Sequence, residues 1–130
     1  MHRFAPIVIL LSVFTLLFSA CGGKAVDPAA KAVVGYLNAL VSKDSNRLSA
    51  LSCSDWEPNA LLELDSLQAV SARLEGLTCA TTGTDGTTSD VSCQGKILVT
   101  YNDEDQELDL SVRTYQVVQQ GGEYLVCGYK

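Results

Sequence analysis

The chain has 130 residues, with 9 Lys+Arg against 15 Asp+Glu and a formal net charge of −6. This length allows one domain and leaves no room for a second core of useful size. The acidic balance argues against nucleic acid as a partner, because phosphate binding needs clustered Lys and Arg, and 47% hydrophobic residues are too many for a disordered chain.

Residues 1–20 have the layout of a secretory signal peptide. Arg3 supplies a positive start, residues 7–18 are apolar, and the small pair Ser19-Ala20 closes the run. The apolar stretch is shorter than the roughly 20 residues that a membrane-spanning helix needs. We therefore predict export and cleavage rather than a membrane span.

Cys21 follows directly after the small pair, and the segment Leu17-Phe18-Ser19-Ala20-Cys21 resembles the lipobox of bacterial lipoproteins. The resemblance implies that the Cys21 thiol takes a diacylglycerol, that cleavage occurs before it, and that residues 21–26 form a lipidated tether. Several acyl chains supply the two membrane signals that stable anchoring requires. The expected location is the extracytoplasmic face of the cell membrane or outer membrane.

The cysteine count agrees with this interpretation, because five is an odd number for an exported protein. If Cys21 is a thioether, an even set of four remains that could form two disulfides in an oxidising compartment. Those four are Cys53, Cys79, Cys93 and Cys127. No two of them stand closer than fourteen positions, which does not fit the C-x-x-C spacing of zinc sites. We therefore predict disulfides and no metal.

Four cysteines allow three connectivities, and the sequence does not choose among them. A hairpin that is symmetric about Gly86 would set Cys79 opposite Cys93, close enough for a bridge. That geometry slightly favours Cys79–Cys93 together with Cys53–Cys127. The two other connectivities stay open.

The first half of residues 27–130, the predicted single domain, has helical patterning. Asp27-Pro28 is typical of an N-cap followed by proline at the first helical position. Apolar residues then recur at helical spacing until about Ser42. Asp44 or Ser45 is expected to cap a second short helix, and a third is plausible over residues 55–64.

After about Ala69 the pattern changes to the alternation of β-strands. A phase slip at Glu75-Gly76 indicates a β-bulge. We expect the apolar residues of 97–101 and 108–112 to share one face across a turn at 102–106, with Tyr101 opposite Leu108. The predicted fold class is α+β, with two or three N-terminal helices packed on a curved sheet of four antiparallel strands.

This arrangement resembles the nuclear-transport-factor-2-like (cystatin-like) superfamily, whose curved sheet wraps a long helix into a cone. The resemblance lies in residues 33–40 and 43–48, which are similar to the opening helix and second helix, and in residues 122–128, which are similar to the last strand. The small strands that the family places between its second and third helices are reduced or absent here. Their absence would narrow or close the pocket.

Few residues offer catalytic chemistry. The single histidine, His2, leaves with the signal peptide, which removes the side chain best suited to proton transfer near neutral pH. We interpret Asp55 and Asp65, near Trp56, as helix-cap and surface residues. The acidic segment 103–109 lacks the turn glycine and distal Glu of an EF-hand, so we interpret it as a charged hairpin tip. We predict no catalytic residue and no cofactor.

Aromatic residues could line a cavity in a cone-shaped fold. The candidates for this pocket are Tyr36, Trp56, Tyr101 and Tyr115. The alternative is that they belong to an ordinary core and its rim.

Together these features predict a lipid-anchored protein of the cell envelope whose domain binds a small ligand or another envelope protein without catalysis. One alternative is a small hydrolase, isomerase or dehydratase that uses a carboxylate inside the cone. Another is a structural or assembly subunit of an envelope complex. A buried carboxylate with a raised pKa would favour the enzyme, and an exposed apolar sheet face would favour assembly.

Overall fold

The computed structural model describes residues 27–130, so the predicted signal peptide, Cys21 and the tether lie outside the described residues. Three helices come first: α1 (Pro28–Ser42), α2 (Ser45–Ala50) and α3 (Glu57–Ser66). A sheet follows, made of β1 (Ser71–Asp85), β2 (Thr88–Tyr101), β3 (Glu104–Asp109), β4 (Thr114–Gln120) and β5 (Glu123–Tyr129), with a 3₁₀ turn η1 (Leu110–Val112) between β3 and β4. Within the described part of the chain, no helix is both long enough and apolar enough to cross a membrane.

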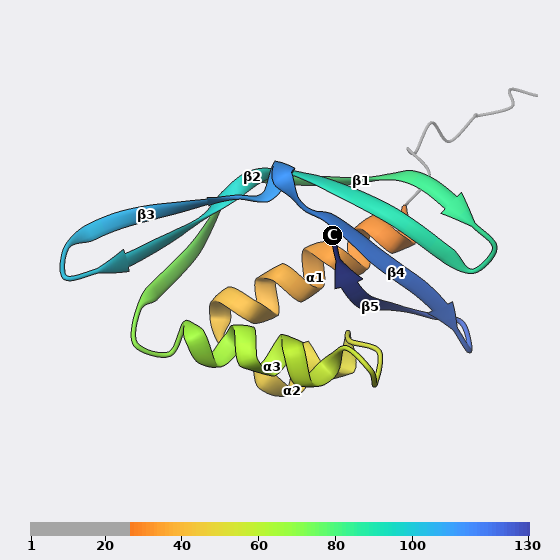
Figure 1. Cartoon of the computed structure of the whole chain (residues 1–130), viewed down its shortest axis with the longest axis horizontal. Coiled ribbons are helices and arrows are strands. Elements are labelled where there is room, and N and C mark those ends of the chain that lie inside the picture. Colours follow the sequence, from red (N-terminus) through yellow and green to blue (C-terminus); the bar gives the residue numbers. More distant parts are fainter. Residues whose placement is uncertain (1–26) are drawn as a thin grey trace, which may run out of the picture.

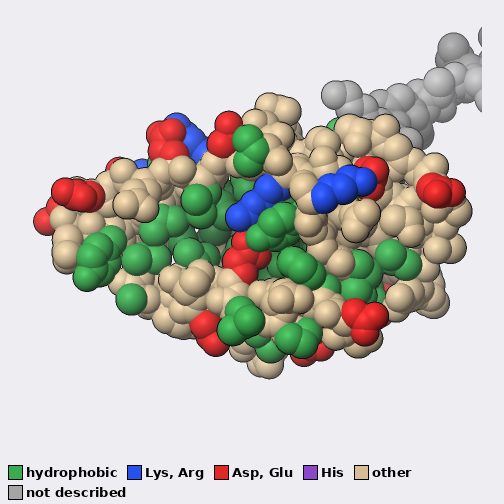
Figure 2. All heavy atoms as spheres, viewed as in Figure 1, with side chains coloured by type: hydrophobic (Ala, Val, Ile, Leu, Met, Phe, Trp, Pro, Cys, Tyr) green, Lys and Arg blue, Asp and Glu red, His purple; other side chains and the backbone are tan. Residues whose placement is uncertain are grey.

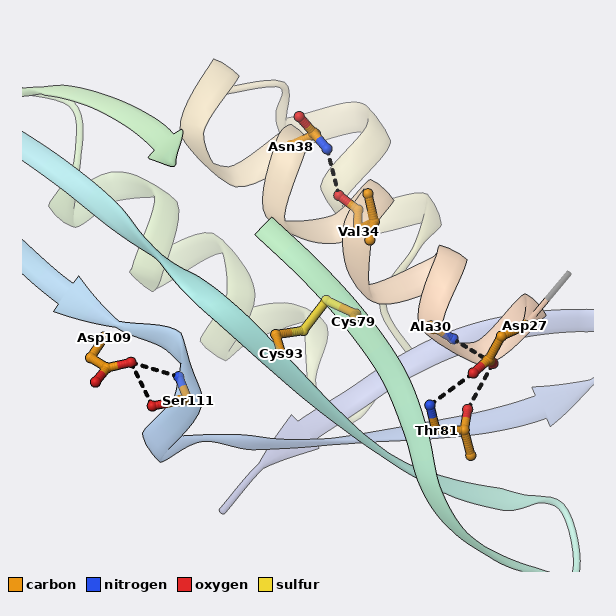
Figure 3. Close-up of a disulfide and its surroundings, with 9 residues drawn as sticks. All are labelled: Asp27, Ala30, Val34, Asn38, Cys79, Thr81, Cys93, Asp109 and Ser111. Atoms are coloured by element: carbon orange, nitrogen blue, oxygen red, sulfur yellow. Dashed lines mark hydrogen bonds between the residues drawn. A yellow bond between two sulfur atoms is a disulfide. The ribbon is translucent and has the colours of Figure 1, made fainter. Parts of the chain in front are cut away.

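The predicted starts of the first two helices are confirmed, whereas the third begins at Glu57 rather than at residue 55. The Asp27 carboxylate accepts a hydrogen bond from the Ala30 N–H at 3.0 Å and caps α1. Asp44 caps α2 in the same way, accepting from the Arg47 N–H at 3.1 Å. Asp27 also accepts bonds from the Thr81 N–H (2.8 Å) and hydroxyl (2.7 Å), which join the start of α1 to β1 (Figure 3).

The predicted fold class is confirmed, with five antiparallel strands where four were expected. The strand order is β1-β2-β4-β5, and β3 pairs with the half of β2 that β4 does not reach. The extra strand arises at η1, which breaks the chain after β3 so that β3 and β4 pair with different halves of the same long strand. Figure 1 shows α1 beneath the curved sheet, α2 and α3 below it, and the β2–β3 hairpin projecting beyond the helices.

The expected register of the β2–β3 hairpin is wrong by four positions. Leu108 lies opposite Ile97, and Tyr101 lies opposite Glu104. The turn contains only Asn102 and Asp103, with φ of 50° and 62°. Positive φ at both central residues is the geometry of the tight hairpin turn that matches strand twist. As a consequence Val112 leaves the expected apolar face and is 75% exposed in η1.

Cys79 and Cys93 are directly opposed in β1 and β2 and form a disulfide, with a Cα–Cα distance of 4.1 Å (Figure 3). The turn itself pairs Asp85 with Thr88, and an unbroken register would put Cys79 opposite Gln94. A register shift between Thr81 and Gly83 moves the pairing by one residue and brings the two cysteines together. The bulge predicted at Glu75-Gly76 is also present, as a second register shift before Thr78.

The second disulfide joins Cys53, between α2 and α3, to Cys127 in β5, with a Cα–Cα distance of 5.2 Å. Backbone hydrogen bonds flank it, from the Cys53 N–H to the Val126 carbonyl (2.9 Å) and from the Val126 N–H to the Leu51 carbonyl (2.7 Å). Of the three possible connectivities, the structure therefore has the one that the hairpin geometry favoured.

The core lies between α1 and the concave face of the sheet. From α1 it takes Val33, Tyr36, Leu37 and Leu40, and from the sheet it takes Val91, Cys93, Ile97, Tyr115, Val117 and Val126, all at most 1% exposed. The apolar stripe predicted for residues 28–42 thus faces the alternating apolar positions of the strands, as a helix-on-sheet layer requires.

Candidate functional site

Three of the four predicted pocket aromatics meet inside the cone. Tyr36 of α1 and Tyr115 of β4 are fully buried, with ring centroids 6.3 Å apart. The ring centroid of Tyr129 in β5 lies 5.5 Å from the ring centroids of Tyr115 and Trp56, and both contacts are edge to face. These separations are typical of favourable aromatic pairs. The fourth candidate, Tyr101, lies apart from them at the end of β2 and is 59% exposed.

A carboxylate and a guanidinium complete this group, and neither was singled out from the sequence. Arg113 donates from Nη1 to Glu63 Oε1 at 2.8 Å. Tyr129 donates to the same oxygen at 3.5 Å, and Tyr36 donates to Glu63 Oε2 at 3.4 Å. We call these six residues the interior cluster: Tyr36, Trp56, Glu63, Arg113, Tyr115 and Tyr129.

The cluster is closed by further contacts among its own members. Trp56 donates from Nε1 to the Tyr36 hydroxyl at 3.0 Å. The Arg113 guanidinium carbon lies 4.2 Å from the centroid of the Tyr129 ring, a cation–π contact. The Trp56 ring lies against Gly128 of β5, whose φ of 135° is a backbone conformation that favours glycine. The Tyr115 hydroxyl is buried near Arg113 but has no hydrogen-bond partner among the described residues.

The electrostatics of the cluster favour fixed protonation states near neutral pH. Burial raises the pKa of Tyr36 and the pKa of Tyr115, so both phenols stay neutral. Burial alone would lower the pKa of Arg113, but the interactions of its guanidinium with Tyr115 and Glu63 are stronger, and the net effect is a raised pKa. The cluster therefore supplies neutral donors and a paired cation. None of its tyrosines is poised to act as a base at neutral pH.

The sequence carries only a faint signal of Glu63 and Arg113. Glu63 stands beside Leu64 and three positions after Ala60 on α3, so it borders the buried stripe of that helix. Arg113 follows η1, where the alternating pattern is interrupted. A charge next to an apolar stripe is usually a solvated rim residue, and only the tertiary structure shows that two such residues, 50 positions apart, form a pair.

The carboxylates considered from sequence lie elsewhere. Asp55 and Asp65 are exposed and take no part in the interior cluster, and neither caps α3. Asp103 and Glu104 lie at the tip of the β2–β3 hairpin, as expected for a charged tip. Within residues 27–130, no group of three His, Cys, Asp or Glu side chains is arranged to hold a metal ion.

Four surface pockets of the described domain have no member of the interior cluster in their walls. A pocket of about 450 Å³ lies by the β1–β2 turn, with Asp85, Asp90 and Lys130 in its wall. Another, of about 280 Å³, lies between α1 and α2 beside Lys31 and Arg47. Between α1 and the sheet, the interior holds the fully buried side chains of Tyr36 and Tyr115.

A second region carries exposed apolar side chains. Tyr101 and Leu108, at 59% and 43% exposure, project from the β2–β3 hairpin on the same face as the buried Ile97. We call Val99, Tyr101 and Leu108 the hairpin face. Figure 2 shows hydrophobic side chains gathered between the β2–β3 hairpin and α3.

Comparison with known proteins identifies the fold. No protein-family model matches the chain, and no curated protein matches it. Among solved structures, it is similar to an NTF2-like protein with a cystatin-like fold from Novosphingobium aromaticivorans, with a TM-score of 0.56, 13% identity, and coverage of 78% of this chain and 77% of that one.

Two further structures are similar to a comparable extent. Aln2 from a Streptomyces species matches with a TM-score of 0.54 and 11% identity over 78% of this chain and 85% of that one. A variant of Rd1NTF2_05 matches with a TM-score of 0.50 and 14% identity over 80% of this chain and 96% of that one. At such low identity the likeness shows the fold alone: the chain has the NTF2-like fold expected from its sequence.

Proposed function

We propose that this chain is a lipid-anchored protein of the cell envelope whose NTF2-like domain binds another molecule and catalyses no reaction. Cys21 carries the lipid, and residues 21–26 hold the domain close to the membrane. The domain itself provides the binding surface.

The observation that carries the anchor is the cysteine pairing. Each of the four cysteines in residues 27–130 is held in a disulfide. Cys21 is therefore the one cysteine left for lipidation, and it stands at the position that a lipobox requires. Two disulfides in a domain of this size also favour an oxidising compartment, which agrees with the signal peptide.

Binding is favoured over catalysis by the interior cluster. An enzyme of this fold would need a reactive group at an accessible pocket. Here the interior carboxylate, Glu63, is engaged by Arg113 and by two tyrosines whose pKa is raised. These contacts serve to hold α3 to the sheet. The alternative of a structural or assembly subunit is favoured by the hairpin face, and partner binding through that face would serve either role.

The test is the intact mass of the full chain purified from bacterial membranes, before and after reduction. We expect the mass of residues 21–130 plus a diacylglyceryl group and an amide-linked acyl chain. Reduction should add four hydrogens, two for each disulfide. Thiol alkylation before reduction should label no cysteine.

The matched control is the substitution Cys21→Ala, which leaves both disulfides in place. This variant should carry no lipid and should still gain four hydrogens on reduction. An unmodified wild-type chain, or one in which Cys21 is crosslinked to another cysteine, would contradict the proposal.

A further inference from the structure

The β2–β3 hairpin leaves part of the concave sheet face without a cover. α1 packs across β1, β2, β4 and β5, whereas β3 packs extensively only on β2. All six residues of β3 are exposed. Tyr101 lies on this face because it alternates in phase with Ile97 along β2. Leu108 lies on it because it pairs directly with Ile97, which is buried in the core. The apolar layer thus continues past the end of its helical cover.

The same hairpin carries a strong negative charge. Residues 103–109 contain five carboxylates and no base. Asp103 and Glu104 lie at the tip, whereas Asp105, Glu107 and Asp109 alternate onto the face of the hairpin opposite Leu108. The nearby Lys96 is already shared between Glu107 (2.6 Å) and Glu75 (3.8 Å). Glu104 lies directly opposite Tyr101, so an acidic side chain borders the hairpin face itself.

This combination of apolar surface and charge selects one kind of occupant. A second copy of the chain would bring two acidic hairpins together, and like charges at close range are repulsive. An anionic lipid surface and nucleic acid are disfavoured for the same reason. A protein segment with one apolar side and one basic side complements both properties of the hairpin.

We propose that the hairpin face docks a cationic amphipathic helix of another protein, whose apolar stripe packs on Tyr101 and Leu108 and whose Lys and Arg side chains meet the acids of the tip. A helix is the expected form because α1 covers the adjoining part of the same face as a helix. The proposal deepens the binding role inferred above and rests on it, but it does not depend on the lipid anchor.

The probe is a fluorescent peptide of about 18 residues, built from Leu and Lys so that Leu occupies one face of a helix. One comparison peptide has the same composition in an order that destroys the apolar face, and another replaces Lys with Glu. Binding to the full lipidated protein, held in phosphatidylcholine nanodiscs, is followed by anisotropy at two salt concentrations, with empty nanodiscs as the blank. We expect the Leu/Lys peptide to bind more tightly than both comparison peptides and to weaken as salt rises.

Paired substitutions locate the site. The double change Tyr101→Ser and Leu108→Ser should weaken binding about tenfold or more, as expected for removal of central apolar contacts. The change Asp103→Asn with Glu104→Gln should weaken binding severalfold and reduce its salt dependence. The control pair Leu62→Ser and Val112→Ser removes two other exposed apolar side chains, at 67% and 75% exposure, and should leave binding unchanged.

Several results would overturn the inference. One is a Leu/Glu peptide that binds as tightly as the Leu/Lys peptide. Another is a loss of binding in the control pair as large as that in the Tyr101 and Leu108 variant. The third is a wild-type protein that self-associates and becomes monomeric when Tyr101 and Leu108 are replaced. Thermal unfolding of each variant confirms that the fold is retained. An absent lipid adduct in the mass experiment would refute the anchor alone, because these binding measurements can then be made on the same protein without nanodiscs.

Discussion

Two regions of this domain use the same kinds of residue for different ends. In the interior cluster, Glu63 and Arg113 pair with each other and with tyrosines, and Tyr36 and Tyr115 are fully buried. On the β2–β3 hairpin, the acids outnumber the bases and Tyr101 is more than half exposed. The first region pairs its polar groups internally, with the exception of the Tyr115 hydroxyl, whereas the second presents both charge and apolar area to solvent.

The difference follows from what covers each part of the sheet. α1 packs on β4 and β5, and Glu63 of α3 reaches Arg113 and Tyr129, so most polar groups there are paired within the protein. The hairpin extends past the helices, where water solvates its charges. We infer that the interior cluster contributes to stability and the hairpin to recognition. Substitutions in the two regions test this division.

Removal of the Cys53–Cys127 disulfide should have the largest effect, because it pins the segment that carries Trp56 against β5. The double change Cys53→Ala and Cys127→Ala should lower the free energy of unfolding by about 4 kcal/mol in the loop-entropy picture. Urea denaturation followed by fluorescence of Trp56, the single tryptophan, measures this loss. Cys79→Ala with Cys93→Ala opens a shorter loop and should cost about 3 kcal/mol. A larger loss from the second pair would contradict the expectation.

Loss of the interior cation should come next. Arg113→Gln leaves Glu63 without its ion pair and should lower the free energy of unfolding by about 2 kcal/mol. The loss is smaller than for a fully buried pair because both side chains are still about one-fifth exposed. Lys96→Gln removes the exposed pair with Glu107 on the hairpin and should lower the free energy of unfolding far less. Chemical denaturation of the two variants compares the regions directly. Equal losses would show that the hairpin pair is as structural as the interior one.

The two buried tyrosines of the cluster should differ although both are fully buried. Tyr36→Phe removes the acceptor of the Trp56 N–H and a donor to Glu63, and should cost about 1–2 kcal/mol. Tyr115→Phe removes a hydroxyl that has no hydrogen-bond partner among residues 27–130 and should be neutral or slightly stabilising. Thermal unfolding of both variants provides the measurement, and the reverse order would disprove the assignment.

Loss of the Asp27 cap of α1 should lower the free energy of unfolding by a smaller amount that depends on pH. The hydrogen bond from the Ala30 N–H is the main cause that lowers the pKa of Asp27 in the folded state, with Thr81 adding to it and burial opposing it. A lowered folded pKa means that the charged carboxylate stabilises the protein above the unfolded pKa of about 3.9 and loses that contribution as pH falls through the folded value. Asp27→Ala should therefore lower the free energy of unfolding by about 1 kcal/mol at pH 6 and by progressively less below pH 4. A cost that grows toward acid pH would contradict this sign.

Much of the fold is readable in the sequence because local chemistry specifies it. Asp27 and Asp44 cap helices through their own carboxylates, which is a property of a few neighbouring residues. The slip at Glu75-Gly76 marks a bulge because side chains alternate with period two. The pairing of Cys79 with Cys93 followed from the centre of one hairpin, although the structure reaches it through a tighter turn and a compensating bulge.

The candidate sites were less accessible to this reasoning. The register of β2 and β3 depends on whether the turn takes two residues or five, and Asn102 and Asp103 adopt the positive φ that decides it. Tyr101 was grouped with Tyr36 and Tyr115 as an aromatic residue, but its strand carries it beyond the helices. Glu63 and Arg113 became a pair only when α3 packed against the chain between η1 and β4.

Local periodicity, capping and residue spacing specify the helices and strands of this protein, its fold class and the candidate roles of its cysteines. The pairing of Glu63 with Arg113 and the exposure of the β2–β3 hairpin arise only when the chain folds. Burial and ion pairing depend on distances between segments that are remote in sequence. Those distances are set when α1 packs on β1, β2, β4 and β5 and the β2–β3 hairpin extends past the helices.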